Sequence, residues 1–174
     1  DKYNAWISVM TEALLPNFTQ FGWGATKAPP EIVEKIQHAL HSGLSSAEEE
    51  EEDRGIVGDF KPLFVRMPDL VEEAMLSLQK YFEAWVGFAL RPTSAYGLRI
   101  YRNNSQLYMH VDKLATHVIS GIFHIDHSDD AEPWPLLIED FEGKTQVVYL
   151  DKGDILFYES AKCVHGRPIP FRGS

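Results

Sequence analysis

The chain changes its hydrophobic periodicity about halfway along, and this change constrains its fold more than any other feature. Before residue 95, apolar side chains recur at the three- and four-residue spacing of amphipathic helices. From Arg99 onwards, apolar and polar residues alternate with a period of two, which is typical of strands with one buried face. Helices followed by a series of short strands predict an α+β fold.

Three helices are expected in the first half, over residues 1–15, 28–43 and 67–90. Pro16 ends the first helix, Gly43 closes the second, and Asp69 is expected to cap the third. His38 and His41 lie in the second helix, where we assign them to its surface or to a structural contact.

Strands are expected over residues 97–104, 116–126, 144–151 and 153–160, separated by Asn-Asn, Asp-Asp, Glu-Gly and Lys-Gly turns. Such a series predicts a β-sandwich or barrel braced by the helices. A chain of 174 residues fits a single domain. We therefore expect residues 1–174 to form one domain, with mainly helical support in 1–95 and the β core in 96–174.

The charge and cysteine content exclude several classes of protein. A net charge of −10 argues against nucleic acid as the main partner, because a phosphate backbone requires a clustered basic face. Much of this charge lies in an acidic loop expected over residues 45–54, which we interpret as solvated and mobile or as attracting a basic peptide. No apolar run is long enough to cross a bilayer. The lone Cys163 excludes an intrachain disulfide and favours a reducing compartment such as the cytoplasm.

The pattern His-x-Asp occurs twice, at His110-Asp112 and at His124-Asp126. On a strand, residues i and i+2 point to the same face, so either pair presents an imidazole beside a carboxylate. His165 offers a third ligand from another strand, and two histidines with one carboxylate suit Fe(II) in oxygenases because one side of the metal stays open. The alternatives are polar residues on strand surfaces, or another metal in a non-catalytic barrel.

The segment from Tyr96 to Ser174, somewhat under half of the chain, resembles the catalytic core of the 2-oxoglutarate- and Fe(II)-dependent dioxygenases, and most closely the prolyl 4-hydroxylase branch. The similar pieces are "IYRNNSQLYMHVD", "THVISGIFHID", "YLDKGDILFYES" and "VHGRPIPFRGS". Within them, the features that match are Tyr101, Gln106, His110, Asp112, the turn 152–154, the strand 155–158 and His165.

This resemblance implies a double-stranded β-helix, a jelly-roll barrel with iron at its mouth, and a hydroxylase that uses Fe(II), 2-oxoglutarate and dioxygen, with ascorbate as a further candidate cofactor. His110, Asp112 and His165 carry over as the metal ligands, because register favours them over His124 and Asp126. A prolyl residue of a peptide is the first substrate to consider, with aspartyl or lysyl side chains or a small metabolite as alternatives. A binding module without turnover and a zinc hydrolase on the same ligands also stay open.

The resemblance also implies residues that hold the cosubstrate. The family anchors the distal carboxylate with a basic residue on the strand after the last ligand, and this chain ends about where that strand should begin. The candidates present are Arg167, which we favour, and Arg172; the alternative for each is simple solvation. Further candidates, each with core packing as its alternative, are Tyr101, Tyr108 and His124. Trp134 is expected at the entrance or in the core, and His117 and His127 in turns or facing outward.

Overall fold

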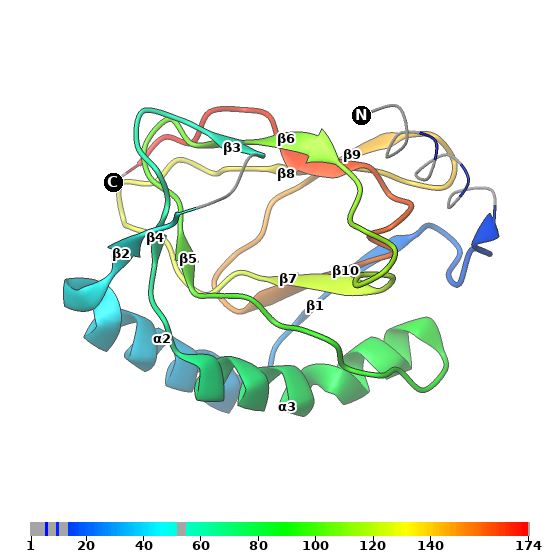
Figure 1. The fold of residues 1–174 in the computed structure, drawn as a ribbon, viewed down its shortest axis with the longest axis horizontal. Coiled ribbons are helices and arrows are strands. Elements are labelled where there is room, and N and C mark those ends of the chain that lie inside the picture. Colours follow the sequence, from blue (N-terminus) through cyan, green and yellow to red (C-terminus); the bar gives the residue numbers. More distant parts are fainter. Residues whose placement is uncertain (1–5, 7–9, 11–13, 52–54, 174) are drawn as a thin grey trace.

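The computed structural model of the chain describes residues 6, 10, 14–51 and 55–173. Figure 1 shows two helices side by side beneath a three-stranded sheet, with a five-stranded sheet above it and a smaller sheet at one end. Every strand pair is antiparallel. The architecture is therefore mixed α/β with mostly antiparallel sheets, as the change of period predicted.

The two long helices are α2 (Pro30–Gly43) and α3 (Pro68–Val86), and a 3₁₀ turn, η1 (Leu44–Ser46), follows α2. The sequence predicted Asp69 as the N-cap of α3, and this prediction is wrong. Met67 occupies the cap position and Pro68 begins the helix, so that Asp69 lies in the first turn, where its charge favours the helix dipole. The helix ends before residue 90, because Gly87 adopts a left-handed conformation with φ of 86°. The helix expected over residues 1–15 lies mostly outside the described residues.

The strands form three sheets. The three-stranded sheet has the order β1-β10-β7, the five-stranded sheet has the order β3-β6-β11-β8-β9, and the end sheet has the order β2-β4-β5. Their bounds are β1 Trp23–Lys27, β2 Glu48–Glu49, β3 Ile56–Val57, β4 Leu63–Phe64, β5 Arg99–Ile100, β6 Gln106–His110, β7 Ser120–Phe123, β8 Leu136–Glu139, β9 Thr145–Val148, β10 Asp154–Tyr158 and β11 His165–Arg167. The strands expected over residues 97–104 and 116–126 are shorter than predicted, and β1 and β8 were not predicted.

Strand β10 is buried on both faces and joins the two halves of the core. Leu156 and Tyr158 belong to the cluster between the sheets, together with Leu136 and Ile138 of β8. The alternate residues of β10 pack instead with Leu78 of α3 and with aromatic side chains of the same helix. The period of two therefore gives β10 two apolar faces, which is typical of a strand that lies between a sheet and a helical layer.

A β-bulge in the five-stranded sheet determines which side chains meet between the sheets. His165 of β11 pairs with His110 of β6, but Arg167 pairs with Leu107, so β6 contains one extra residue between the two pairs. Gly166 lies at this point, and a Cβ there would be 2.7 Å from the carbonyl oxygen of Tyr108. A glycine is therefore required for β11 to approach β6 this closely.

The described part of the acidic run contains a short strand and one buried glutamate, which the expected solvated loop does not include. Glu48 and Glu49 form β2 and pair with Phe64 and Leu63 of β4. Glu50 is buried, and its carboxylate accepts hydrogen bonds from the guanidinium of Arg99. Glu50 therefore departs from the expected solvated loop, because the Arg99 guanidinium offsets the loss of water around its carboxylate. None of the described helices is long and apolar enough to span a bilayer.

Candidate metal centre

Three side chains that are distant in the sequence meet between the sheets. His110 ends β6, Asp112 follows two residues later, and His165 begins β11 opposite His110. One ligand atom from each of these residues lies within 4.8 Å of the others. Asp112 lies beyond the end of β6, where its backbone N–H donates to the carbonyl of Ser160 at 2.8 Å. The carboxylate is therefore positioned by a contact with the loop after β10 rather than by strand alternation alone.

The distances among the three groups leave room for one ion. Asp112 Oδ1 lies 3.6 Å from His110 Nε2 and 4.0 Å from His165 Nε2. Atoms that each lie about 2.1 Å from a common divalent metal, in neighbouring coordination positions, are about 3.0–3.4 Å apart, so binding of an ion would draw the three groups slightly closer together. The imidazole of His165 is almost fully buried, while His110 and Asp112 are partly open to solvent. The cluster is therefore enclosed on one side and accessible on the other.

Backbone contacts orient both imidazoles in the tautomer that a metal requires. His110 Nδ1 lies 2.7 Å from the carbonyl oxygen of Tyr108, and His165 Nδ1 lies 2.9 Å from that of Cys163. A carbonyl can only accept a hydrogen bond, so each Nδ1 holds the proton and donates it. Each Nε2 is then the ring atom that faces Asp112, and it is the atom that can bind a metal once it carries no proton.

Neighbouring side chains support the carboxylate and the buried imidazole. The hydroxyls of Ser120 and Ser160 lie 2.7 Å apart, and Ser120 Oγ also approaches Asp112 Oδ2 at 3.5 Å. The Tyr158 ring packs against His165 with a centroid separation of 4.5 Å. Burial, followed by the nearby Asp112 charge, raises the pKa of Tyr158, so its hydroxyl stays protonated. The Ser120–Ser160 pair was not recognised in the sequence, because no local pattern links a strand with a distant loop.

The cluster opens into a cavity of about 1900 Å³. Its lining includes the three candidate ligands and, among the residues predicted to contact the cosubstrate, Tyr101, His124 and Arg167. Trp134 also lines this space and donates its indole N–H to the carbonyl of Ile169. The structure thus brings the candidate ligands and four of the five predicted cosubstrate residues to one cavity, since Tyr108 lines it as well.

Arg167 is a buried cation in the wall of this cavity. It lies two residues after His165 on β11, and only 6% of its surface is exposed. Its guanidinium stacks over the Trp134 ring at 4.5 Å and donates to the Trp134 carbonyl. Burial, opposed by the nearby Tyr101, lowers the pKa of Arg167 to about 10. No carboxylate within residues 14–51 and 55–173 forms a salt bridge with it.

The second His-x-Asp pair does not form a metal site. His124 Nε2 contacts His127 Nδ1 at 3.0 Å, while Asp126 is engaged by Lys152 and by His41 of α2. Burial and the charge of Arg167 lower the pKa of His124 to about 4, so this imidazole is neutral at pH 7. His41 therefore makes one of the contacts that its position in the helix predicted.

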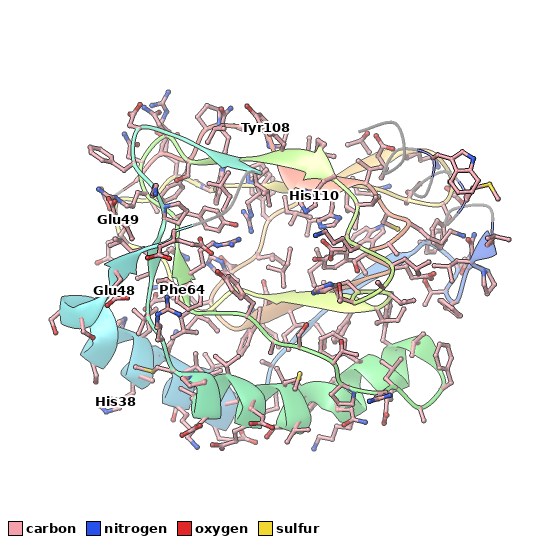
Figure 2. The ribbon with its side chains drawn as sticks, in the orientation of Figure 1. His38, Glu48, Glu49, Phe64, Tyr108 and His110 are labelled. Carbon is pink, nitrogen blue, oxygen red and sulfur yellow. The ribbon has the colours of Figure 1, made fainter. Side chains whose placement is uncertain are left out.

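The side chains of Tyr108 and Arg172 are exposed, unlike those of the other predicted cosubstrate residues. The Tyr108 side chain is 56% exposed, and Figure 2 shows it on the opposite side of β6 from His110. The bulge separates the two, since strict alternation would have placed them on one face. Arg172 is exposed and donates to Asn104 Oδ1 at 2.6 Å. His117 and His127 lie in the loops beside β7, as expected, with His127 exposed.

Comparison with known proteins supports the fold rather than a family assignment. No family model matches the chain, and no curated protein matches it. Among solved structures, a prolyl 4-hydroxylase from Pseudomonas putida is similar, with a TM-score of 0.61 and 12% sequence identity. The match covers 95% of this chain and 100% of the other. The chain therefore has a prolyl-hydroxylase-like fold, at an identity that shows no more than the fold.

Proposed function

We propose that this protein is an Fe(II)- and 2-oxoglutarate-dependent oxygenase that hydroxylates its substrate. The observation that supports this proposal most strongly is the meeting of His110, Asp112 and His165 at one end of a large cavity. The likeness to the Pseudomonas putida prolyl 4-hydroxylase supports it independently, because the similarity extends over nearly the whole of both chains.

The three groups fit Fe(II) by their chemistry. Two imidazoles and one carboxylate form the donor set of non-haem iron oxygenases, which bind the metal from one side. The hydrogen bonds to the Tyr108 and Cys163 carbonyls hold the imidazoles in the required tautomer before any metal arrives. His110 and Asp112 border the cavity, so the opposite side of an ion bound here would face open space.

Arg167 is the residue that we assign to the distal carboxylate of 2-oxoglutarate. A buried guanidinium with no carboxylate partner among the described residues is costly, and an organic acid in the cavity would offset that cost. Arginine also offers two parallel donors that match a carboxylate. Tyr101 and the neutral His124 lie beside Arg167 in the cavity wall and would add neutral hydrogen bonds.

When bound, Fe(II) and 2-oxoglutarate would supply the chemistry that activates dioxygen and transfers one oxygen atom to a C–H bond. The protein residues hold and orient the reactants. The Ser120–Ser160 pair and the Ser160 carbonyl steady Asp112, and Tyr158 excludes water from the buried side of His165. Arg167 would set the depth at which the cosubstrate lies.

A prolyl residue in a peptide or protein is the substrate that we propose first. The similar solved structure is described as a prolyl 4-hydroxylase, and the cavity is larger than the roughly 300–1,000 Å³ of typical small-molecule sites. Aspartyl and lysyl peptides and small metabolites form the comparison panel. The assay is the formation of hydroxylated product from each candidate.

The function is tested by measuring succinate released from 2-oxoglutarate with Fe(II) in air. We expect turnover by the native chain, loss of at least a hundredfold in His110→Ala, and no change in His38→Ala, whose side chain lies on the outer face of α2. Circular dichroism checks that His110→Ala stays folded. Arg167→Gln should retain metal binding and raise KM for 2-oxoglutarate by about a hundredfold, since a charged pair is lost.

Two results would overturn the proposal. Hydrolytic activity that persists without oxygen or 2-oxoglutarate would indicate a zinc hydrolase instead. Tight binding of metal to the three ligands without succinate formation on any substrate would indicate a binding module that does not turn over.

A further inference from the structure

The acidic run contains one glutamate that differs sharply from its neighbours. The side chains of Glu48 and Glu49 are 71% and 59% exposed, whereas that of Glu50 is 5% exposed. Figure 2 shows Glu48 and Glu49 at the outer end of the molecule, beside the small sheet β2-β4-β5. A carboxylate is rarely buried unless a specific partner holds it, so the position of Glu50 requires an explanation.

The partner of Glu50 is Arg99, on β5 at the edge of the same sheet. Arg99 Nε and one terminal nitrogen each donate to a different carboxylate oxygen of Glu50 at 2.7 Å. The Tyr96 hydroxyl donates to the same carboxylate. Burial alone would lower the pKa of Arg99, but its hydrogen bonds to Glu50 and Tyr101 raise that pKa above its usual value. The bidentate pair fixes the guanidinium plane as well as its charge.

Arg99 links this buried pair to the proposed cosubstrate pocket. Its guanidinium lies 5.9 Å from the Tyr101 ring centroid, and Tyr101, as a neighbouring hydrogen-bonding side chain, helps to raise the pKa of Arg99. The Tyr101 ring packs edge-on against Trp134 with a centroid separation of 4.9 Å, and the Arg167 guanidinium lies over the Trp134 ring. Contacts therefore run without interruption from Glu50 to Arg167 along the cavity wall.

We propose that Glu50 is a positioning residue for the cosubstrate pocket: its carboxylate fixes Arg99, and Arg99 holds the Tyr101 side chain against Trp134 and beside Arg167. This inference rests on the proposed function, because it assigns the Tyr101 side of the cavity to 2-oxoglutarate. The proposal also accounts for the burial of Glu50, which attraction of a basic substrate to the acidic run would not explain.

A purely structural salt bridge would predict a different pattern of mutational effects. Such a bridge would stabilise the small sheet and affect every property of the protein alike. A positioning chain predicts that cosubstrate affinity responds to Glu50 only while the Tyr101 hydroxyl is present to receive the hydrogen bond. A double-mutant cycle separates the two, since coupled residues have non-additive effects.

The experiment measures binding of 2-oxoglutarate by calorimetry to protein loaded with Co(II), so that no turnover is required. The variants are Glu50→Gln, Tyr101→Phe and the double variant. Glu49→Gln is the matched control, because Glu49 is the adjacent glutamate and pairs with an arginine at the surface. Co(II) affinity and the thermal midpoint are measured for each variant. Arg99→Lys replaces Glu50→Gln in the cycle if the latter does not fold.

We expect Glu50→Gln to weaken 2-oxoglutarate binding by about tenfold, as for loss of one charge-assisted contact, with Co(II) affinity changed by less than about threefold. In the Tyr101→Phe background the same substitution should have no further effect, and Glu49→Gln should bind normally. Equal weakening with and without the Tyr101 hydroxyl would overturn the inference, as would unaltered binding in Glu50→Gln. Failure of the native Co(II) protein to bind 2-oxoglutarate would overturn the proposed function itself.

Discussion

Gly166 tests how the approach of β11 to β6 builds the metal centre, because Gly166 is not itself a candidate ligand. A Cβ at this position would lie 2.7 Å from the Tyr108 carbonyl oxygen and 2.9 Å from that of Leu107. Ordinary van der Waals contact begins at about 3.4 Å, so β11 would have to move away from β6 by roughly 0.7 Å. Both atoms belong to the backbone of the paired strand and no side chain can rotate to relieve the contact.

A displacement of this size acts on the ligands directly, since His165 and His110 lie on the two strands that would separate. Gly166→Ala should destabilise the protein by about 1–3 kcal/mol, as for other overpacked sites. It should also weaken Co(II) binding by about 10–100-fold, because metal sites tolerate errors of only about 0.5 Å. The assays are urea denaturation and titration of Co(II) against a competing chelator.

Gly58→Ala is the matched control. Its Cβ would lie 3.1 Å from the nearest backbone atom, which requires a shift of only a few tenths of an ångström and moves neither β11 nor a ligand. We expect a small loss of stability and native Co(II) affinity. If Gly166→Ala bound Co(II) as tightly as the native chain, the dependence of the site on the approach of β6 to β11 would be refuted.

Two further predictions concern stability. The pKa of His124 is about 4 in the folded protein and about 6.5 in the unfolded chain. The unfolded state therefore binds more protons between these two pH values. The contribution of His124 to the free energy of unfolding is fully present above pH 6.5 and falls as the pH drops towards 4. The free energy of unfolding is measured at pH 7 and pH 4.5, and His124→Gln should reduce the difference between the two values by about 1.5 kcal/mol after allowance for solvent screening. An unchanged difference would contradict the lowered pKa of His124. Glu159 is fully buried and accepts hydrogen bonds from the Phe18 and Thr19 backbone N–H groups and the Thr19 hydroxyl. Glu159→Leu should cost about 3 kcal/mol by urea denaturation, and a loss below about 1 kcal/mol would show that water replaces the carboxylate.

The parts of the fold that the sequence predicted are those in which local pattern and burial agree. The period of two over residues 153–160 indicated β10, and Gly43 was correctly predicted to close α2. The strand β8 was missed because Leu136 follows prolines that are more typical of a loop. Its burial comes from pairing with β9 and β11, which no local pattern reveals.

The candidate site also contains residues that were predicted correctly and one, Tyr108, whose orientation was not. Residue type and spacing made His110, Asp112 and His165 one candidate set, the resemblance to dioxygenases singled them out, and the structure brings the three together. Tyr108 was a candidate cosubstrate residue because it flanks the Gln106 loop, and alternation along a regular strand would put it on the face of His110. The bulge reverses that relation, and bulges depend on the partner strand rather than on the strand that contains them.

The spacing of His165 and Arg167 on β11 connects the two halves of the proposed mechanism. Residues i and i+2 share a face and are separated by about 6.6–7 Å along a strand, so β11 alone would set the distance between the metal and the anchoring cation. A slip of β11 by one residue would turn both side chains out of the cavity together, leaving neither half of the site. The glycine between them prevents such a slip, because the close approach to Tyr108 that it permits is available in one register only. The same residue therefore fixes the register of the sheet, the meeting of the imidazoles and the placement of the cation.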